Sequence, residues 1–230
     1  MIFRPDFARP GFSLASLRSL IWILPVLGLL GGCQAAYYGA LEKIGIPKRE
    51  VLVERVAKAR TAQEEAKEQF SSALEKFLAI SKVEPREIKE RYNLLSAELK
   101  RNETRATEVR DRLAGVKDVA EALFSEWKDE LAQYSSAELR SRSETQLAAT
   151  QRSYRDLLVA MDRAASRMEP VLSAFRDQVL FLKHNLNAQA VRSLDATSRT
   201  LQADIGRLIE DMEKSIREAD AFIKTLQPSA

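Results

Sequence analysis

Residues 51–70 read VLVERVAKARTAQEEAKEQF, and apolar side chains recur along this stretch at alternating steps of four and three. Because an α-helix turns once in about 3.6 residues, such a series lies on one face of a helix and is typical of a seam between supercoiled helices. A strand would need alternation by two, which this stretch lacks. The series runs through Leu52, Val56, Ala59, Gln63, Ala66, Phe70, Ala73, Phe77 and Ile80.

The same register continues after Pro85 over a much longer segment. Asn102 and Glu130 break the apolar seam there, and an asparagine at one such position usually fixes register and helix number at some cost in stability. Gly115 weakens the predicted helix by about 1 kcal/mol relative to alanine, which the seam can offset. The members are Ile88, Tyr92, Leu95, Leu99, Asn102, Ala106, Val109, Leu113, Val116, Ala120, Leu123, Trp127, Glu130 and Tyr134.

A polar stretch at 135–146, SSAELRSRSETQ, interrupts the seam, which resumes one residue out of phase at Leu147. Ser135 and Glu138 have the spacing of a capping box that would begin a new helix. The other interpretation is a continuous helix with a kink or a locally unwound turn. The absence of glycine and proline favours the continuous or kinked helix.

The prolines divide the rest of the chain. Proline suits the first turn of a helix and disrupts its interior, so Pro47, Pro85 and Pro170 predict helix starts and Pro228 an end. The predicted helices span about 48–81, 86–168 and 171–226, the middle one being the longest, and short connections make them antiparallel neighbours. The expected fold of residues 47–227 is all-α, an elongated antiparallel coiled coil or three-helix bundle, with a kink near 135–146.

The N-terminus has the pattern of an export signal. Arginines at positions 4, 9 and 18 precede about 11 uncharged residues at 20–30, a stretch too short to span a bilayer. It ends in Leu30-Gly31-Gly32-Cys33, which matches a bacterial lipobox. We therefore predict a signal peptide at 1–32, cleavage between Gly32 and Cys33, and a membrane-proximal tether at 33–46. An ordinary signal peptide with a chance cysteine is the alternative.

Cys33, the only cysteine of the chain, would carry a covalent lipid and no other cofactor is expected. Two or more acyl chains hold a protein stably on a membrane. Gln34 stands where aspartate would favour retention in the inner membrane, so the sequence favours the outer membrane, with the protein facing the periplasm. With its thiol acylated, the cysteine is also withdrawn from disulfide formation.

Charge gives no sign of a nucleic-acid partner. The leader holds three arginines and one aspartate, or +2 of the net +3, which leaves +1 for residues 33–230. The remaining charges are dense but interspersed, as on exposed helix faces.

The chain has a single histidine, His184, so a metal site or a catalytic triad would have to depend on it. No metal site, catalytic residue or enzymatic activity is predicted. His184, Asn185 and Asn187 crowd polar groups beside apolar ones and are candidates for a partner contact, or for a pH-responsive site if His184 is half-buried. The alternative is that they are solvated or hydrogen-bonded across the bundle.

Four stretches, at 45–56, 168–172, 181–190 and 212–223, resemble a bacterial family catalogued as domain of unknown function 2959. The resemblance covers nearly all of the chain after the leader. It implies a helical envelope protein, often with a lipoprotein signal, and supplies no catalytic residues to transfer.

We therefore expect a lipid-anchored structural or interaction scaffold with a protein partner in the envelope, and self-association remains open. An accessory subunit docking on an envelope transporter or pore is the alternative. A small-ligand carrier is a weaker one, since slender bundles seldom enclose a pocket of several hundred cubic ångströms.

Overall fold

The structure of the chain is a computed structural model that describes residues 37–38, 45–79, 87–185 and 188–227, with the side chains of 188–197 left out. The chain divides into two units, residues 1–46 and 47–230, and the second is described by itself. Its described residues form four α-helices and no strand. They are α2 (Lys48–Leu78), α3 (Ile88–Leu131), α4 (Ala137–His184) and α5 (Ala188–Leu226).

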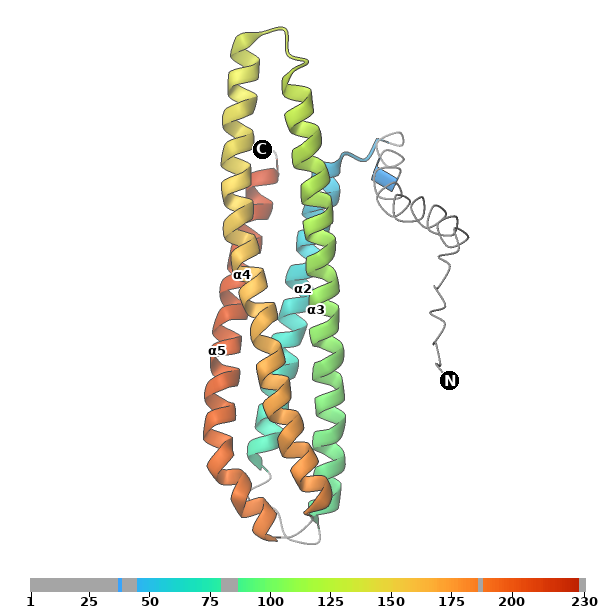
Figure 1. The fold of residues 1–230 in the computed structure, drawn as a ribbon, viewed down its shortest axis with the longest axis vertical. Helices are drawn as coiled ribbons and strands as arrows, with labels where there is room; N and C mark the ends of the chain where they lie inside the picture. The colour runs from blue at the N-terminus through green and yellow to red at the C-terminus, as the bar shows by residue number, and fades with distance from the viewer. Residues whose placement is uncertain (1–36, 39–44, 80–86, 186–187, 228–230) are drawn as a thin grey trace, which may run out of the picture. The chain divides into compact units, whose positions relative to one another are not determined.

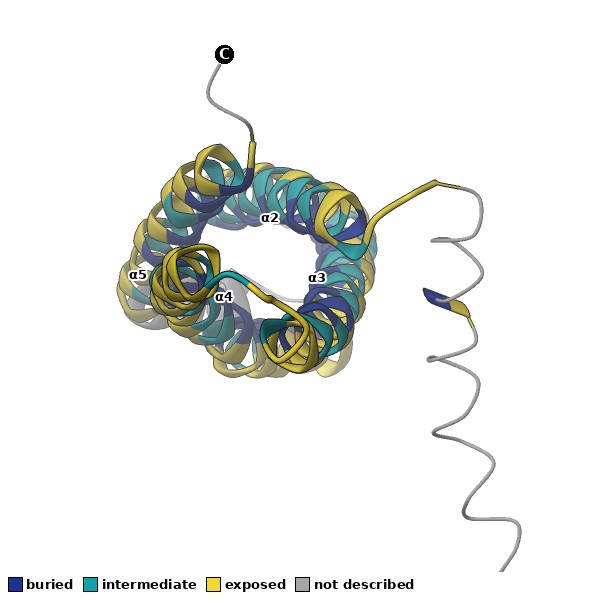
Figure 2. Ribbon diagram, turned by 90° about the horizontal axis from the view of Figure 1, so that it is seen from above, coloured by how far each residue is buried: buried dark blue, intermediate teal, exposed yellow. Residues whose placement is uncertain are grey.

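The four helices lie side by side as an elongated antiparallel bundle (Figure 1). Seen from one end, each helix has two neighbours: α2 lies between α3 and α5, and α4 lies between the same two helices on the other side (Figure 2). Buried residues line the inside of this ring and exposed residues its outside. The all-α prediction is therefore confirmed, whereas the predicted number of three helices is wrong.

The seam predicted from residues 51–70 is the part of α2 that lies in the core of the bundle. Every described member of that series in α2, including Gln63, is at most 2% exposed. Phe77 of α2 and Phe175 of α4 meet edge to face with ring centroids 5.9 Å apart, which ties the diagonal helices together. Along α3 the predicted positions are buried from Leu95 to Leu123.

The predicted continuous helix through 135–146 is wrong, because α3 ends at Leu131 and α4 begins at Ala137. The new helix is capped by Ser136, whose Oγ accepts a hydrogen bond from the backbone N–H of Leu139 at 3.3 Å. A serine cap begins a helix without any help from glycine or proline. The seam also fades before the turn, since Tyr134 is 42% exposed, so little burial would hold a continuous helix there.

The predicted helix start at Pro170 is also wrong, because Pro170 lies inside α4. Proline removes the hydrogen bond to the carbonyl of residue 166, but Ser166 and Pro170 are both exposed, so water can satisfy that carbonyl. Met168, Val171 and Leu172 are at most 1% exposed, and their burial keeps the segment helical. The chain instead turns after His184, where Asn185 ends α4.

Ion pairs at seven-residue intervals join the exposed edges of α3 and α4. They are Glu103 with Arg176 at 2.7 Å, Arg110 with Glu169 at 3.4 Å, and Lys117 with Asp162 at 2.7 Å. Sliding one helix by a heptad would set Arg110 against Arg176, or Glu103 against Glu169. Each exposed pair contributes about 0–1 kcal/mol, so this ladder acts mainly on register.

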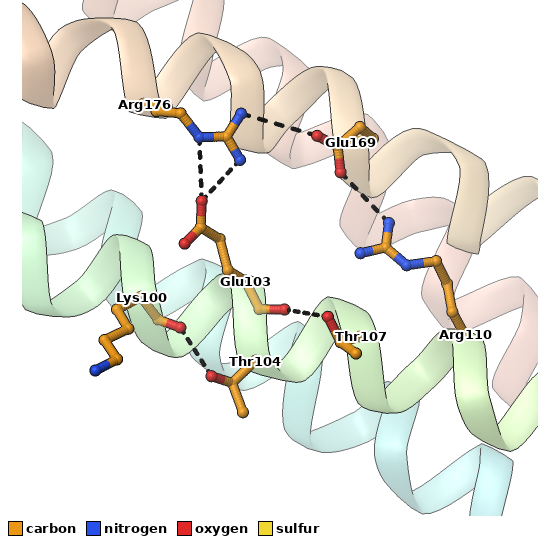
Figure 3. A network of polar contacts seen from close by, with 7 residues as sticks. All are labelled: Lys100, Glu103, Thr104, Thr107, Arg110, Glu169 and Arg176. Carbon is orange, nitrogen blue, oxygen red and sulfur yellow. Dashed lines mark hydrogen bonds and ion pairs between the residues drawn. The ribbon is translucent and has the colours of Figure 1, made fainter.

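Figure 3 shows how two of these pairs are linked. Arg176 donates from Nε and Nη2 to Oε1 of Glu103 at 3.1 and 2.7 Å, and its Nη1 lies 3.8 Å from Glu169. Glu169 in turn accepts from Arg110. Hydrogen bonding to Glu103 is the main cause that raises the pKa of Arg176 above its ordinary value. A continuous network of ion pairs therefore links α3 to α4 along this edge.

We expect Pro170→Ala to stabilise the protein by about 1–3 kcal/mol, because it restores a backbone hydrogen bond and removes a steric clash at an exposed position. Equilibrium urea unfolding followed by circular dichroism measures the change. Ser173→Ala, also exposed on α4, is the matched control and should shift stability by less than about 0.5 kcal/mol. A less stable Pro170→Ala protein would mean that the packing of α4 requires the proline.

Candidate functional site

The turn between α3 and α4 projects beyond the ends of the other two helices (Figure 1). Lys48, the first residue of α2, pairs with Glu126 at 2.7 Å, and α3 continues for five residues past it. Tyr154 of α4 packs on Phe222 at 6.0 Å, four residues before α5 ends. Leu226 is then level with about residue 150, so α4 projects by about 13 residues, or ~20 Å. We call residues 127–147 the hairpin end.

Apolar side chains are exposed at the hairpin end. Tyr134 is 42% exposed in the turn, and Leu139 in the first turn of α4 is 52% exposed. Trp127 is half-buried between the two helices, where its Nε1 donates a hydrogen bond to Ser143 Oγ at 2.8 Å. Exposed pairs, Arg142 with Glu138 and Arg140 with Glu144, flank these groups. The hairpin end thus exposes aromatic and aliphatic side chains near the α3–α4 turn, with charged side chains beside them.

A second exposed cluster lies at the opposite end of the bundle, on the last turns of α4. Leu180 is 53% exposed and Phe181 41% exposed, and they share a helix face with His184 and Asn185. We call these four residues the end patch. It lies beyond the Phe77–Phe175 contact, where α2 comes to its C-terminus.

The structure describes two of the three predicted contact residues, His184 and Asn185. His184 is the exposed last residue of α4, so the half-buried setting that a pH-responsive role would need is not present. Asn185 is the cap, and its Nδ2 donates to the carbonyl of Phe181 at 3.0 Å. Asn187 lies outside the described residues, as do Gly32 and Cys33. A partner contact at His184 and Asn185 stays a prediction.

The described residues contain neither a membrane-spanning helix nor a cluster of metal ligands. None of the described helices is both long and apolar enough to cross a membrane. Within the same part of the chain, no group of three or more histidine, cysteine, aspartate and glutamate side chains could hold a metal ion.

A large open hollow lies on the surface over α2 and α3, and His184 is not among the residues that line it. It has a volume of about 900 Å³ and is lined by Arg55, Lys100, Glu103, Thr104, Thr107, Glu108, Asp111 and Arg112. Thr104 and Thr107 donate their hydroxyl protons to backbone carbonyls one turn earlier (Figure 3). Ligand pockets are mostly apolar and enclosed, and this hollow is an open, charged groove.

Glu98 is a fully buried carboxylate that joins α3 to α2. Its two oxygens accept hydrogen bonds from Lys76 Nζ and Gln69 Nε2, both at 2.6 Å, and Arg101 pairs with it from the same helix. Burial alone would raise the pKa of Glu98. The hydrogen bonds from Lys76 and Gln69, with the charges of Lys76 and Arg101, outweigh burial and hold that pKa below its ordinary value of 4.5.

Asn102, the polar residue predicted to fix the register, lies one turn after Glu98 and is fully buried. Its Nδ2 donates to the carbonyl of Glu98 at 2.9 Å, while its Oδ1 has no hydrogen-bond partner among the described residues. A buried polar layer of this kind favours one arrangement of helices over others, which supports a structural role for Asn102.

The fold and these two ends define an all-α protein built on an antiparallel bundle of four described helices. The chain belongs to the family described as a protein of unknown function (DUF2959), whose family model matches residues 37–226. No curated protein and no solved structure matches the chain.

Reasoning from the sequence did not identify the hairpin end as a surface. Its signals were present: the Ser135–Ser136 pair, and a seam whose last members, Glu130 and Tyr134, are followed by a polar stretch. The buried Glu98 was also missed, because it lies one residue before the seam position Leu99 and reads as part of the charged face.

We expect Glu98→Gln to lower the free energy of unfolding by about 1–2 kcal/mol near neutral pH, because it removes charged hydrogen bonds whose cations are partly exposed. Since folding depresses the pKa of Glu98, its contribution is present above pH 4.5 and is lost as the pH falls through the folded pKa. The gap between native and variant protein should therefore close in acid.

Urea unfolding of both proteins at about pH 7 and about pH 3 measures this gap. Glu103→Gln is the matched control, since Glu103 forms an exposed ion pair on the same helix, and its effect should stay below about 1 kcal/mol. A gap for Glu98→Gln that is constant with pH would show that the ionised carboxylate does not provide the stability.

Proposed function

We propose that this protein is a lipid-anchored envelope protein that serves as a structural or interaction scaffold and presents its end patch to a protein partner. The anchor is the lipid on Cys33, with cleavage between Gly32 and Cys33, and the membrane is the outer membrane, on which the protein faces the periplasm. The observation that carries the proposal is the exposed end patch, which lies at the far end of the bundle from the point where the anchored segment joins it.

The length of α2 supports this arrangement. The chain that leads from Cys33 enters the bundle at Pro47, directly before α2. Over 31 residues α2 extends about 46 Å, and its C-terminal Phe77 packs on Phe175, a little more than one turn before Leu180. The end patch is therefore separated from Pro47, where the tether joins the bundle, by roughly the full length of α2.

The composition of the end patch suits a protein contact. Leu180 and Phe181 expose apolar surface at one site, whereas most exposed apolar residues on a protein are scattered. Aromatic anchors contribute strongly to binding, and the neighbouring imidazole and amide of His184 and Asn185 can supply specificity through hydrogen bonds. Val179 and Leu182, next to the patch on α4, are buried and hold this part of the helix on the core.

We expect Cys33→Ala to release the protein from the membrane fraction and to abolish incorporation of radiolabelled palmitate in growing cells, because the thiol is the attachment point of the lipid. Fractionation and autoradiography measure the two effects. His184→Ala, at the other end of the bundle, should leave both unchanged. Palmitate labelling that persists in the Cys33→Ala protein would refute the anchor.

We expect a photo-crosslinking amino acid at position 181 to capture a discrete partner in intact cells, and one at position 159 to capture none. Val159 is the matched control because it is 68% exposed on the same helix but stands alone. Replacing His184 and Asn185 by alanine should weaken the product from position 181 severalfold. Identical products from both positions would contradict a specific end patch.

Mass spectrometry of the captured partner also decides between the two forms of this function. A structural envelope protein supports the scaffold. A transporter or pore component would make the chain an accessory subunit that docks through the same surface.

A further inference from the structure

We infer that the hairpin end rests on the lipid–water interface of the membrane that holds the anchor, as a second and non-covalent contact. This inference rests on the proposed lipid anchor and adds a partner for a surface that the proposed function does not use. It is carried by the place where the tether joins the bundle, by the length of the projection and by the side chains at its tip.

The tether joins the bundle at the base of the hairpin end. Lys48, one residue after Pro47, pairs with Glu126 of α3 at 2.7 Å, directly before the hairpin end begins. Arg49 donates from Nε to the carbonyl of Leu226 at 2.8 Å, which fixes the end of α5 at the same height. The covalent connection to Cys33 and the tip of the hairpin therefore belong to the same end of the bundle.

The lengths allow the tip to reach the membrane. The 14 residues at 33–46 span at most about 50 Å when extended, and α4 projects about 20 Å beyond the end of α5. A membrane surface within reach of the lipid on Cys33 can thus meet the tip with the tether well short of its limit. The end patch would then face away from that surface.

The tip has the chemistry of an interfacial contact. Tyrosine and tryptophan rings prefer the headgroup level of a bilayer, because an apolar ring and a polar group can each find a matching environment there. Tyr134 and Leu139 are exposed at the tip, and Trp127 lies half-buried behind them. Ser135 and Ser136 separate the tyrosine from α4 and are compatible with headgroups.

Charge decides which kind of membrane contact this is. Residues 127–147 hold three basic and four acidic side chains, a net charge of −1, so attraction to anionic lipids is not the driving force. The contact is apolar and shallow, and two exposed side chains bind weakly by themselves. The anchor makes it effective, since a tethered surface meets the membrane at a high local concentration.

Single-tryptophan chains test the inference by fluorescence. The chain has two tryptophans, Trp22 in the predicted signal peptide and Trp127 in α3. Both are replaced by phenylalanine, so that no native tryptophan emits even if the signal peptide is retained. Leu139→Trp then reports on the tip, and Val159→Trp reports on an exposed site about 30 Å further along the same helix. The full chains are purified from membranes and reconstituted in phosphatidylcholine vesicles whose acyl chains are brominated near the headgroup.

We expect emission from the Leu139→Trp chain to shift to the blue and to be quenched severalfold more than emission from the Val159→Trp chain. Adding Tyr134→Ser should reduce that difference. Equal quenching at the two positions, in protein that floats with the vesicles, would overturn the inference and leave the anchor standing. A blue shift that needs no lipid and grows with protein concentration would overturn it in favour of a second copy of the chain.

Flotation and mass spectrometry test the lipid anchor independently of the quenching comparison. A chain that does not float with vesicles and whose mass lacks the lipid refutes the proposed anchor, and coupling Cys33 to a maleimide lipid then allows the same quenching comparison. Circular dichroism checks that each variant is folded. If replacing both tryptophans unfolds the protein, the fallback is a Trp22→Phe chain that keeps Trp127, and quenching of Trp127 is then compared with and without Tyr134→Ser.

Discussion

Burial of the apolar seam is the constraint on which the rest of this structure depends. Four amphipathic helices each offer one apolar face, and a ring in which every helix has two neighbours covers all four. Phe70, Phe77, Phe175 and Phe222 are the largest side chains removed from water in this way. Because apolar burial is non-directional, it brings the helices together without choosing how far each slides along the next.

Polar groups fix how far each helix is shifted along its neighbours. The ladder from Glu103 to Lys117 on α3 matches its partners on α4 in one register, and buried Glu98 ties α3 to α2. On the other side Arg163 and Arg167 of α4 pair with Asp211 of α5, whose side chain is 10% exposed. Each interaction is modest in free energy, but a slipped bundle would separate Glu98 from Lys76, and Asp211 from Arg163 and Arg167, which is costly for buried charges.

Unequal helix lengths then give the bundle two different ends. Because α2 and α5 stop short of the α3–α4 turn, one end is a two-helix projection with an aromatic tip, and the other carries the end patch. Residues 33–46, the proposed tether, connect to the bundle at Pro47, next to the projection. The proposed function and the membrane contact both follow from this polarity: one end suits attachment and the other suits a partner.

The sequence by itself determined the all-α class, the seam of α2, the start of α2 at Lys48 and the end of α5 at Leu226, because periodicity and proline before a helix act over a few residues. The tertiary structure decided the number of helices. Whether 135–146 continues a helix depends on what covers its apolar face, and Pro170 stays helical only because Met168 and Leu172 are buried by other helices. For the same reason the sequence did not predict the hairpin end. Its side chains are exposed because α2 and α5 end before the α3–α4 turn, and the spacing of residues in α3 and α4 carries no information about where the other two helices end.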